Sequence, residues 1–313
     1  MINLRYHIVS LVAVFLALGL GIVMGSTVID RVTVDALNSN LEDVRRSVGA
    51  IRDENRRLGD QIKQGQDFAE TTRDQLLRGH LRNVPVLVLA VSGVDRRPVD
   101  DLRSALVTAQ ATVQGTIWFT PKMRLANEGD VRALATALDL GVSDRPEVVR
   151  RQALARMAAA REAATSDASP LAALQSAGFV TYEGPPTATS TSASLPLTLA
   201  ALPVAGTRYV VVSGAGAEVG DDALALPLVQ TFAQASARVV AAESGEDTQG
   251  GRAVFVGRLR GDVVSARLST VDNLDSPMGQ TATVLALEDL GVPRFGHYGV
   301  DRSAQRILPA PAA

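Results

Sequence analysis

Hydrophobic and polar positions near the N-terminus predict a membrane-spanning helix. Residues 8–29 read IVSLVAVFLALGLGIVMGSTVI, a run of 22 residues without a charge. At about 1.5 Å per residue, such a helix is long enough to cross a hydrocarbon core about 30 Å thick. A cleaved signal peptide is the alternative, because Arg5 precedes the run and Gly25 and Ser26 lie near its end. Its apolar core would be only about 7–15 residues long, so the run favours an uncleaved anchor.

Charges around this run favour one orientation. Arg5 and His7 precede it, whereas Asp30, Arg31 and Asp35 follow it closely. Positive charge tends to stay on the cytoplasmic side of a membrane. The sequence therefore predicts a plasma-membrane protein with its N-terminus inside and its C-terminal part outside the cytoplasm.

Small residues recur every four positions within the apolar run. They are Ala13, Ala17, Gly21 and Gly25, and the last two form a GxxxG pair. Residues four apart share one face of a helix, and glycine there permits close approach of a second backbone. The spacing predicts a transmembrane dimer face. Chance is the alternative, because glycine and alanine are common in membrane helices.

After the apolar run, apolar residues recur at alternating spacings of three and four positions. The positions are Val34, Leu37, Leu41, Val44, Val48, Ile51, Asn55, Leu58 and Ile62. This spacing is typical of the a and d positions of a coiled coil. Asn55 falls at an a position, where a buried Asn pairs with its copy in a parallel two-stranded coil. The sequence therefore predicts a homodimeric coiled-coil stalk over residues 30–66. The alternative is one amphipathic helix packed on its own domain, because Gly49 and Gly59 weaken the helix and the pattern fades at Gly65.

The rest of the chain predicts an α/β domain. Strands are expected at residues 84–90, 113–119, 179–183, 209–213, 238–242, 253–256 and 266–269, and helices at 99–109, 131–140, 147–164, 170–177, 222–234 and 277–290. Several of these strands are continuous apolar runs, which indicates a mainly parallel sheet with helices on both faces, a three-layer α/β domain. For the last helix, Ser276 is the expected N-cap and Pro277 the first residue.

The predicted organisation has six parts. They are a cytoplasmic N-terminus (1–7), a transmembrane helix (8–29), the stalk (30–66), a connector (67–82), the extracytoplasmic domain (83–303, with a Pro/Ser/Thr-rich loop at 184–197) and a flexible tail (304–313). Val91-Ser92-Gly93 matches Val212-Ser213-Gly214, each after a predicted strand, which indicates a possible duplicated βαβ unit.

Composition narrows the chemistry. The 313 residues carry 31 Lys and Arg against 33 Asp and Glu, so a nucleic-acid partner is not expected. The absence of cysteine excludes disulfides and thiolate metal sites. Neither a Walker A loop, HExxH nor GxSxG occurs, and the GxGxxxG run at residues 214–220 reads as a tight turn, not a dinucleotide loop. We expect no catalytic residues, no cofactor and no metal site, and hence a protein that is not an enzyme.

Two clusters near the C-terminus have open interpretations. One cluster consists of four acidic residues whose carboxylates could hold a hard cation: Asp272, Asp275, Glu288 and Asp289. Asp275 and its neighbours also suit a helix N-terminus, where negative charge is favoured, and we prefer this capping interpretation. The cluster of Phe295, His297 and Tyr298 lies among glycines. It predicts either a tight structural turn or a partner-binding tip.

Motifs at both ends resemble those of one family. They are MINLRYHIVSL at residues 1–11, AVFLAL at 13–18, GIVMGS at 21–26, STVD at 269–272, VLAL at 284–287 and GHYG at 296–299. With them the chain resembles the actinobacterial copper transporter family typified by MctB, also called SteB-like. The resemblance implies one of two roles. One is an outer-membrane channel that keeps intracellular copper low. The other is a single-pass plasma-membrane protein that works with the membrane protein SteA to control peptidoglycan hydrolysis and cell separation.

The residues favour the second role. An outer-membrane channel is normally a closed barrel of strands with alternating lipid-facing residues. This chain instead has one apolar helix, a heptad stalk and continuous-run strands. We therefore expect a membrane-anchored homodimer in contact with lipid that presents its α/β domain to a partner such as an SteA-like protein. An outer-membrane copper transporter is the alternative, and copper enters only through the family resemblance.

Overall fold

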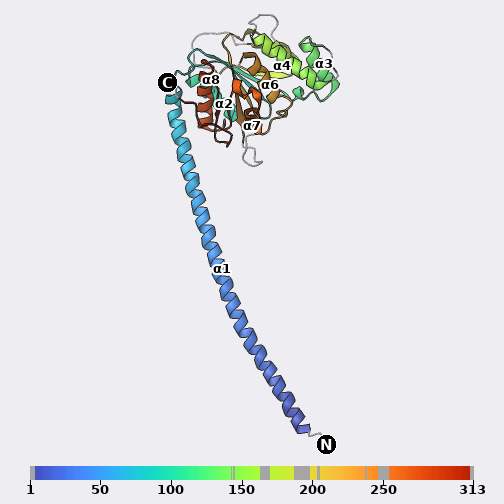
Figure 1. Cartoon of the computed structure of the whole chain (residues 1–313), viewed down its shortest axis with the longest axis vertical. Helices are drawn as coiled ribbons and strands as arrows, with labels where there is room; N and C mark the ends of the chain where they lie inside the picture. The colour runs from blue at the N-terminus through green and yellow to red at the C-terminus, as the bar shows by residue number, and fades with distance from the viewer. Residues whose placement is uncertain are drawn as a thin grey trace. The chain divides into compact units, whose positions relative to one another are not determined.

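The computed structural model describes residues 4–141, 143, 145–162, 170–186, 198–202, 205–236, 238–245 and 254–310 (Figure 1). The chain divides into two compact units, Met1–Gly65 and Gln66–Ala313. Most of the loop predicted at residues 184–197 lies outside the described residues.

From Leu4 on, the residues of the first unit belong to α1, a helix over Leu4–Leu77. Its segment Arg5–Gly25 has a mean hydropathy of 2.6 and no buried part, which confirms a helix long and apolar enough to cross a membrane. Farther along, Arg46 pairs with Asp43 and Arg57 with Glu54, each three residues apart. Such exposed pairs add a few tenths of a kcal/mol each to a helix.

The last turns of α1 belong to the α/β domain. Leu77 and Leu81 are fully buried in its core. The Arg73 Nη1 atom donates to Gln280 Oε1 at 2.8 Å, and His80 Nδ1 lies 2.7 Å from Glu288 Oε2. The expected connector at residues 67–82 is therefore helical to Leu77 and forms part of the folded domain.

The domain is built on one seven-stranded sheet. Its strands are β1 Pro85–Val91, β2 Thr112–Phe119, β3 Val180–Glu183, β4 Arg208–Gly214, β5 Val239–Ser244, β6 Ser269–Val271 and β7 His297–Tyr298. The strand order is β3-β2-β1-β4-β5-β6-β7, and β3 pairs antiparallel while the other pairs are parallel. The mainly parallel sheet expected from the continuous apolar runs is confirmed.

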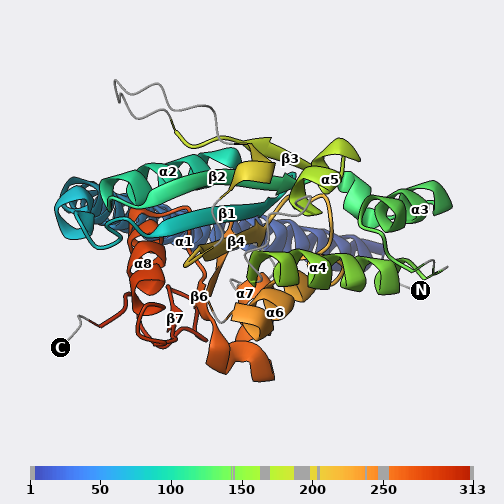
Figure 2. The same cartoon turned by 90° about the horizontal axis from the view of Figure 1, so that it is seen from above.

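Helices cover both faces of the sheet, as Figures 1 and 2 show. They are α2 Arg96–Thr108, α3 Glu128–Ala137, α4 Pro146–Glu162, α5 Pro170–Ser176, α6 Ala225–Ser236, α7 Val254–Arg260 and α8 Pro277–Asp289, with 3₁₀ turns η1 Pro121–Arg124, η2 Leu199–Ala201 and η3 Val263–Arg267. Helix α2 packs beside α8, and α4 packs beside α6. The three-layer architecture is thus confirmed. The start of α8 is also confirmed, since the Ser276 Oγ atom accepts from Gly279 N at 3.0 Å.

Two strand predictions were wrong. Residues 254–256 open helix α7 instead of forming a strand, because the Glu243 carboxylate accepts from the N–H groups of Val254 and Val256, each at 2.9 Å. Residues 266–267 belong to η3, whose start is capped by the Asp262 side chain accepting from Val264 N at 3.0 Å. The strand begins only at Ser269.

The C-terminal segment also differs from the expected flexible tail. Residues 304–310 are described, and Arg306 forms an isolated parallel bridge with Tyr298. Gln305 N donates to His297 O at 2.8 Å, and Gly299 N donates to Arg306 O at 3.0 Å. The segment therefore covers the outer edge of β7, a two-residue strand that sequence patterning does not reveal.

Candidate functional site

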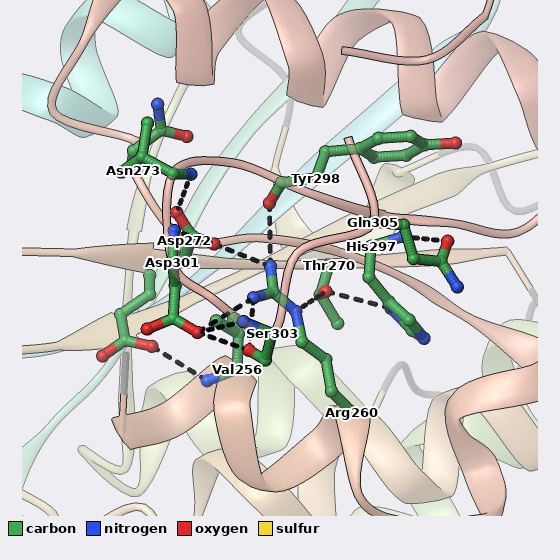
Figure 3. A network of polar contacts seen from close by, with 12 residues as sticks. Val256, Arg260, Thr270, Asp272, Asn273, His297, Tyr298, Asp301, Ser303 and Gln305 are labelled. Atoms are coloured by element: carbon green, nitrogen blue, oxygen red, sulfur yellow. Dashed lines mark hydrogen bonds and ion pairs between the residues drawn. The ribbon is translucent and has the colours of Figure 1, made fainter. Parts of the chain in front are cut away.

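The two C-terminal sequence motifs meet at one edge of the sheet. STVD supplies β6 and the residue after it, and GHYG supplies β7, which pairs with β6 through Thr270↔His297 and Val271↔Tyr298. Figure 3 shows the polar side chains that gather there around Arg260, the last residue of α7. We call Arg260, Thr270, Asp272, Asp301 and Ser303 the Arg260 cluster.

The guanidinium of Arg260 uses all three of its nitrogen atoms (Figure 3). The Nε atom donates to Thr270 Oγ1 and the Nη1 atom to Ser303 Oγ, both at 2.8 Å. The Nη2 atom donates to Tyr298 O at 2.8 Å and lies 2.9 Å from Asp272 Oδ2. The planar fork of an arginine therefore ties α7 to β6, to β7 and to the turn that follows β7.

Asp272 holds that turn from the other side. Its Oδ1 atom accepts from Val300 N at 2.7 Å, and its Oδ2 atom accepts from Asp301 N at 3.2 Å. Gly299 has a φ of +130°, and a Cβ built there would lie 2.1 Å from Asp272 Oδ1. Glycine is needed at 299 because any side chain would collide with the carboxylate. This contact explains why an acid ends one motif and a glycine ends the other.

The ion pair at the centre of the cluster is shielded from water. The side chains of Arg260 and Asp272 are 4% and 1% exposed, and that of Asp301 is 9% exposed. A buried pair of this kind is costly to break from one side, because the remaining charge stays buried without compensation. The cluster therefore joins α7 to this edge of the sheet at a site that is largely shielded from water.

The environment of His297 disfavours the charged form of its ring. Burial lowers the pKa of His297, and the positive charge of Arg260 lowers it further. Thr270 Oγ1, which accepts from Arg260, also lies within hydrogen-bond distance of His297 Nδ1, 3.1 Å away, and the donor of this second bond is set by the tautomer of the ring.

The predicted partner-binding tip is mostly inside the domain. Tyr298 is 5% exposed, and Phe295 packs partly buried against the core. Burial raises the pKa of Tyr298, and the nearby Asp289 carboxylate raises it further. A Cβ at Gly296 would lie 2.2 Å from Tyr298 Oη, so this glycine makes room for the tyrosine ring. These contacts account for the aromatic and glycine pattern as a tight structural turn.

The residues predicted to mediate dimerisation are not covered by other parts of the described chain. Ala13, Ala17 and Gly21 are exposed, and Gly25 is half-exposed. A Cβ on Gly21 or Gly25 would meet nothing within 4 Å. Along the predicted stalk, the apolar seam residues are between 40% and 63% exposed; they are Leu37, Leu41, Val44, Val48, Ile51, Leu58 and Ile62. Asn55 is exposed too, and the side chain of Val34 lies outside the described set.

The glycine-rich turn after β4 lies at the point where the strand order reverses. Ligands of open α/β sheets usually bind at the carboxyl ends of the strands at this point, here β1 and β4. In this chain Glu218 N donates to Ser92 O at 2.7 Å. A Cβ at Gly93 would lie 2.2 Å from Gly216 O. Among the described residues, the two loops thus pack backbone against backbone at this point of the sheet.

The acidic residues near α8 have separate partners. Asp275 accepts from Ser244 Oγ at 2.9 Å and from Gly245 N at 2.6 Å, so it caps the end of β5 while Ser276 caps α8. Asp289 pairs with Arg294 at 3.2 Å, and Glu288 contacts His80. In the part of the chain that the structure describes, no group of three or more His, Asp or Glu side chains is placed to hold a metal ion.

Sequence reasoning missed Arg260. Its partners lie farther along the chain on β6 and in the turn after β7, so no local spacing marks it. A signal did exist in Asp272, Gly296 and Gly299, which the motifs already singled out. An acid and glycines of this kind need a partner in space, and the structure supplies the arginine.

The fold and these contacts define a class of protein with one N-terminal apolar helix and a doubly wound α/β domain. Comparison with known proteins gives the family. The family model described as "Copper transport outer membrane protein, MctB" matches residues 1–309. The chain belongs to this family.

Curated relatives agree with this assignment over nearly the whole chain. Proteins named "Copper transporter MctB" from Mycobacterium bovis and Mycobacterium tuberculosis are each 26% identical over 326 residues, covering 98% of this chain and 99% of theirs. The protein of that name from Mycobacterium leprae is 27% identical over 332 residues, with the same coverage.

Proposed function

We propose that this protein is a single-pass, membrane-anchored homodimer of the cell envelope that presents its α/β domain to an extracytoplasmic partner. In this proposal the N-terminus is cytoplasmic, the anchor lies in the plasma membrane, and the domain acts by binding and not by catalysis. The observation that carries the proposal is α1, a helix of 74 residues in which the apolar Arg5–Gly25 segment is followed by an exposed apolar seam.

The anchor is supported by the absence of any cover on the apolar segment. None of the Arg5–Gly25 window is buried. Exposed apolar surface of this extent is unfavourable in water, at about 25 cal/mol per Å². A lipid bilayer removes that cost.

The homodimer is supported by the seam. Its large apolar side chains are 40–63% exposed and repeat with the 3.5-residue period of a helix pair. An identical helix in parallel presents the same seam in the same register, and Asn55 would then face its own copy.

The partner follows from the family resemblance. We expect an SteA-like membrane protein, and a role in peptidoglycan hydrolysis and cell separation.

A second candidate function is copper transport across the outer membrane. It is favoured by the description of the family and by the name of the mycobacterial relatives. In this candidate copper is the cargo.

Deletion and complementation in the native bacterium separate the two candidates. The deletion strain receives the wild-type chain, a chain whose residues 8–25 are replaced by an unrelated single-pass helix, or a soluble chain without residues 1–29. Cell separation and cellular copper are measured in each strain.

Our proposal predicts that deletion impairs cell separation and leaves copper content unchanged. The chain with the substitute anchor restores separation at least in part, and the soluble chain does not. A deletion strain that separates normally but accumulates copper, and that only the wild-type helix restores, would overturn the proposal in favour of transport.

A further inference from the structure

The base of α1 leaves one apolar face uncovered by the α/β domain. Phe68 is 71% exposed and Leu76 is 54% exposed, whereas Leu77, the next residue, is fully buried. Adjacent residues of a helix are about 100° apart around its axis, so the domain covers the Leu77 side and leaves the Leu76 side open.

This open face continues the heptad register of the stalk. Counting in sevens from the a positions Asn55 and Ile62 gives Ala69 and Leu76 as the next two a positions, with Thr72 at d. Thr72 fits an apolar seam, because its hydroxyl donates to Phe68 O within the helix at 2.8 Å and its methyl group remains to pack. Gly65 therefore occupies one d position within a longer pattern.

The outer face of the helix keeps the same register independently. Aspartate occupies four successive f positions, opposite the seam and on both sides of Gly65; the residues are Asp53, Asp60, Asp67 and Asp74, whereas the two f positions before them are Ser39 and Arg46. All four aspartates are exposed. A charged outer face that keeps the register of the seam across Gly65 is consistent with one continuous amphipathic pattern on both sides of this glycine.

The domain occupies a different side of the helix base. Arg73 falls at an e position, and its Nη1 atom donates to the nearly fully buried Gln280 of α8. Leu77, at b, lies in the domain core. Ala69 lies between this side and the open face and is half-buried, and Thr72, farther round on the open face, is half-buried too.

We propose that the surface through which two copies associate extends beyond Gly65 along Ala69, Thr72 and Leu76, so that a second copy of the chain contacts the helix base beside the α/β domain. This inference rests on the homodimer of the proposed function. Phe68, at g, borders the extended seam and contacts the second copy on the side of its Arg73, since g and e positions flank a parallel seam. The interface between the two copies thus continues along α1 as far as the α/β domains.

Cysteine cross-linking tests the extension, because the chain has no cysteine and each introduced thiol is the only one. Three variants of the full chain are oxidised mildly in native membranes: Val48→Cys at a in the stalk, Leu76→Cys at a in the base, and Asp74→Cys at f as the matched control. Leu76 and Asp74 are both exposed, so neither change disturbs the core, and unchanged fluorescence of Trp118 verifies folding.

We expect disulfide-linked dimers from Val48→Cys and Leu76→Cys, with at least about five-fold more from Leu76→Cys than from Asp74→Cys. Dimers from Val48→Cys with no excess of Leu76→Cys over Asp74→Cys would overturn the extension and leave the stalk dimer standing. Dimers from neither seam variant would overturn both. Dimers from Leu76→Cys alone would support the contact at the base and overturn the stalk seam.

Discussion

Removing Asp272 tests whether the Arg260 cluster holds the sheet edge together. Asp272→Ala leaves the guanidinium of Arg260, 4% exposed, without its closest carboxylate, and it releases the N–H groups of Val300 and Asp301. Breaking a buried ion pair from one side costs about 3–5 kcal/mol. Asp301 Oδ1 lies 3.8 Å from Arg260 and compensates in part, so we expect the lower half of that range.

The assay is urea unfolding of the full chain in mild detergent. Trp118, the only tryptophan, lies in β2 within the domain and reports its unfolding. Arg132→Ala is the control, because it removes an exposed pair with Glu128 at 3.7 Å and should cost less than about 1 kcal/mol. An Asp272→Ala loss no greater than that of Arg132→Ala would refute the reasoning.

A double-mutant cycle tests the contact between the two motifs. Gly299→Ala places a Cβ against the Asp272 carboxylate at a φ of +130°, so alone it destabilises the domain through both collision and backbone strain. With Asp272→Ala the collision is relieved while the strain remains. The two losses should then sum to more than the loss of the double variant, by about 0.5–3 kcal/mol. Additive losses would show that the motifs do not touch as described.

Four further outcomes are expected. Leu77→Ala and Leu81→Ala should each lower the free energy of unfolding by about 2–5 kcal/mol in the same urea assay, whereas Val107→Ala at a 42% exposed position should lower it far less. Burial raises the pKa of Asp289, so the folded chain binds more protons there than the unfolded chain. The stability that Asp289 adds to the fold is therefore fully present below the ordinary Asp pKa of about 3.9 and is lost as the pH rises through the raised pKa. Asp289→Asn should remove this pH dependence from the free energy of unfolding measured between the two pKa values. Gly21→Leu should weaken dimerisation in membranes, measured by energy transfer between labelled chains, while Gly19→Leu, off the predicted face, should not. Asn55→Val should strengthen the stalk dimer in sedimentation experiments but loosen its register, which would appear as disulfides between thiols at non-matching positions.

The sequence predicts most of the fold where local pattern decides structure. The runs VPVLVLA and YVVVS form the neighbouring central strands β1 and β4, because a continuous apolar sequence is typical of a strand that is buried on both faces of a sheet. Ser276 and Pro277 mark the start of α8 for equally local reasons. The helical base of α1 was missed, since its burial depends on Gln280 and Glu288 from α8.

Contacts between distant segments explain the other errors. Helix α7 begins where the Glu243 carboxylate accepts hydrogen bonds from the N–H groups of Val254 and Val256. The local sequence of residues 253–256 gives no sign that Glu243 caps the helix there. The Arg260 cluster could not be predicted from local sequence either, because it joins residues from α7, from β6 and from the turn after β7. The STVD motif contains Thr270 and Asp272, two of the five residues of the cluster, and only the fold could supply the arginine.

The most direct test of the central claim is where the native chain resides and whether its anchor is kept. Plasma membrane and outer envelope are separated from native cells, and mass spectrometry asks whether residues 1–26 remain on the protein. We predict an intact N-terminus in the plasma-membrane fraction. A cleaved chain in the outer envelope would contradict the membrane-anchored homodimer, because it would remove the anchor together with the face formed by Ala13, Ala17, Gly21 and Gly25.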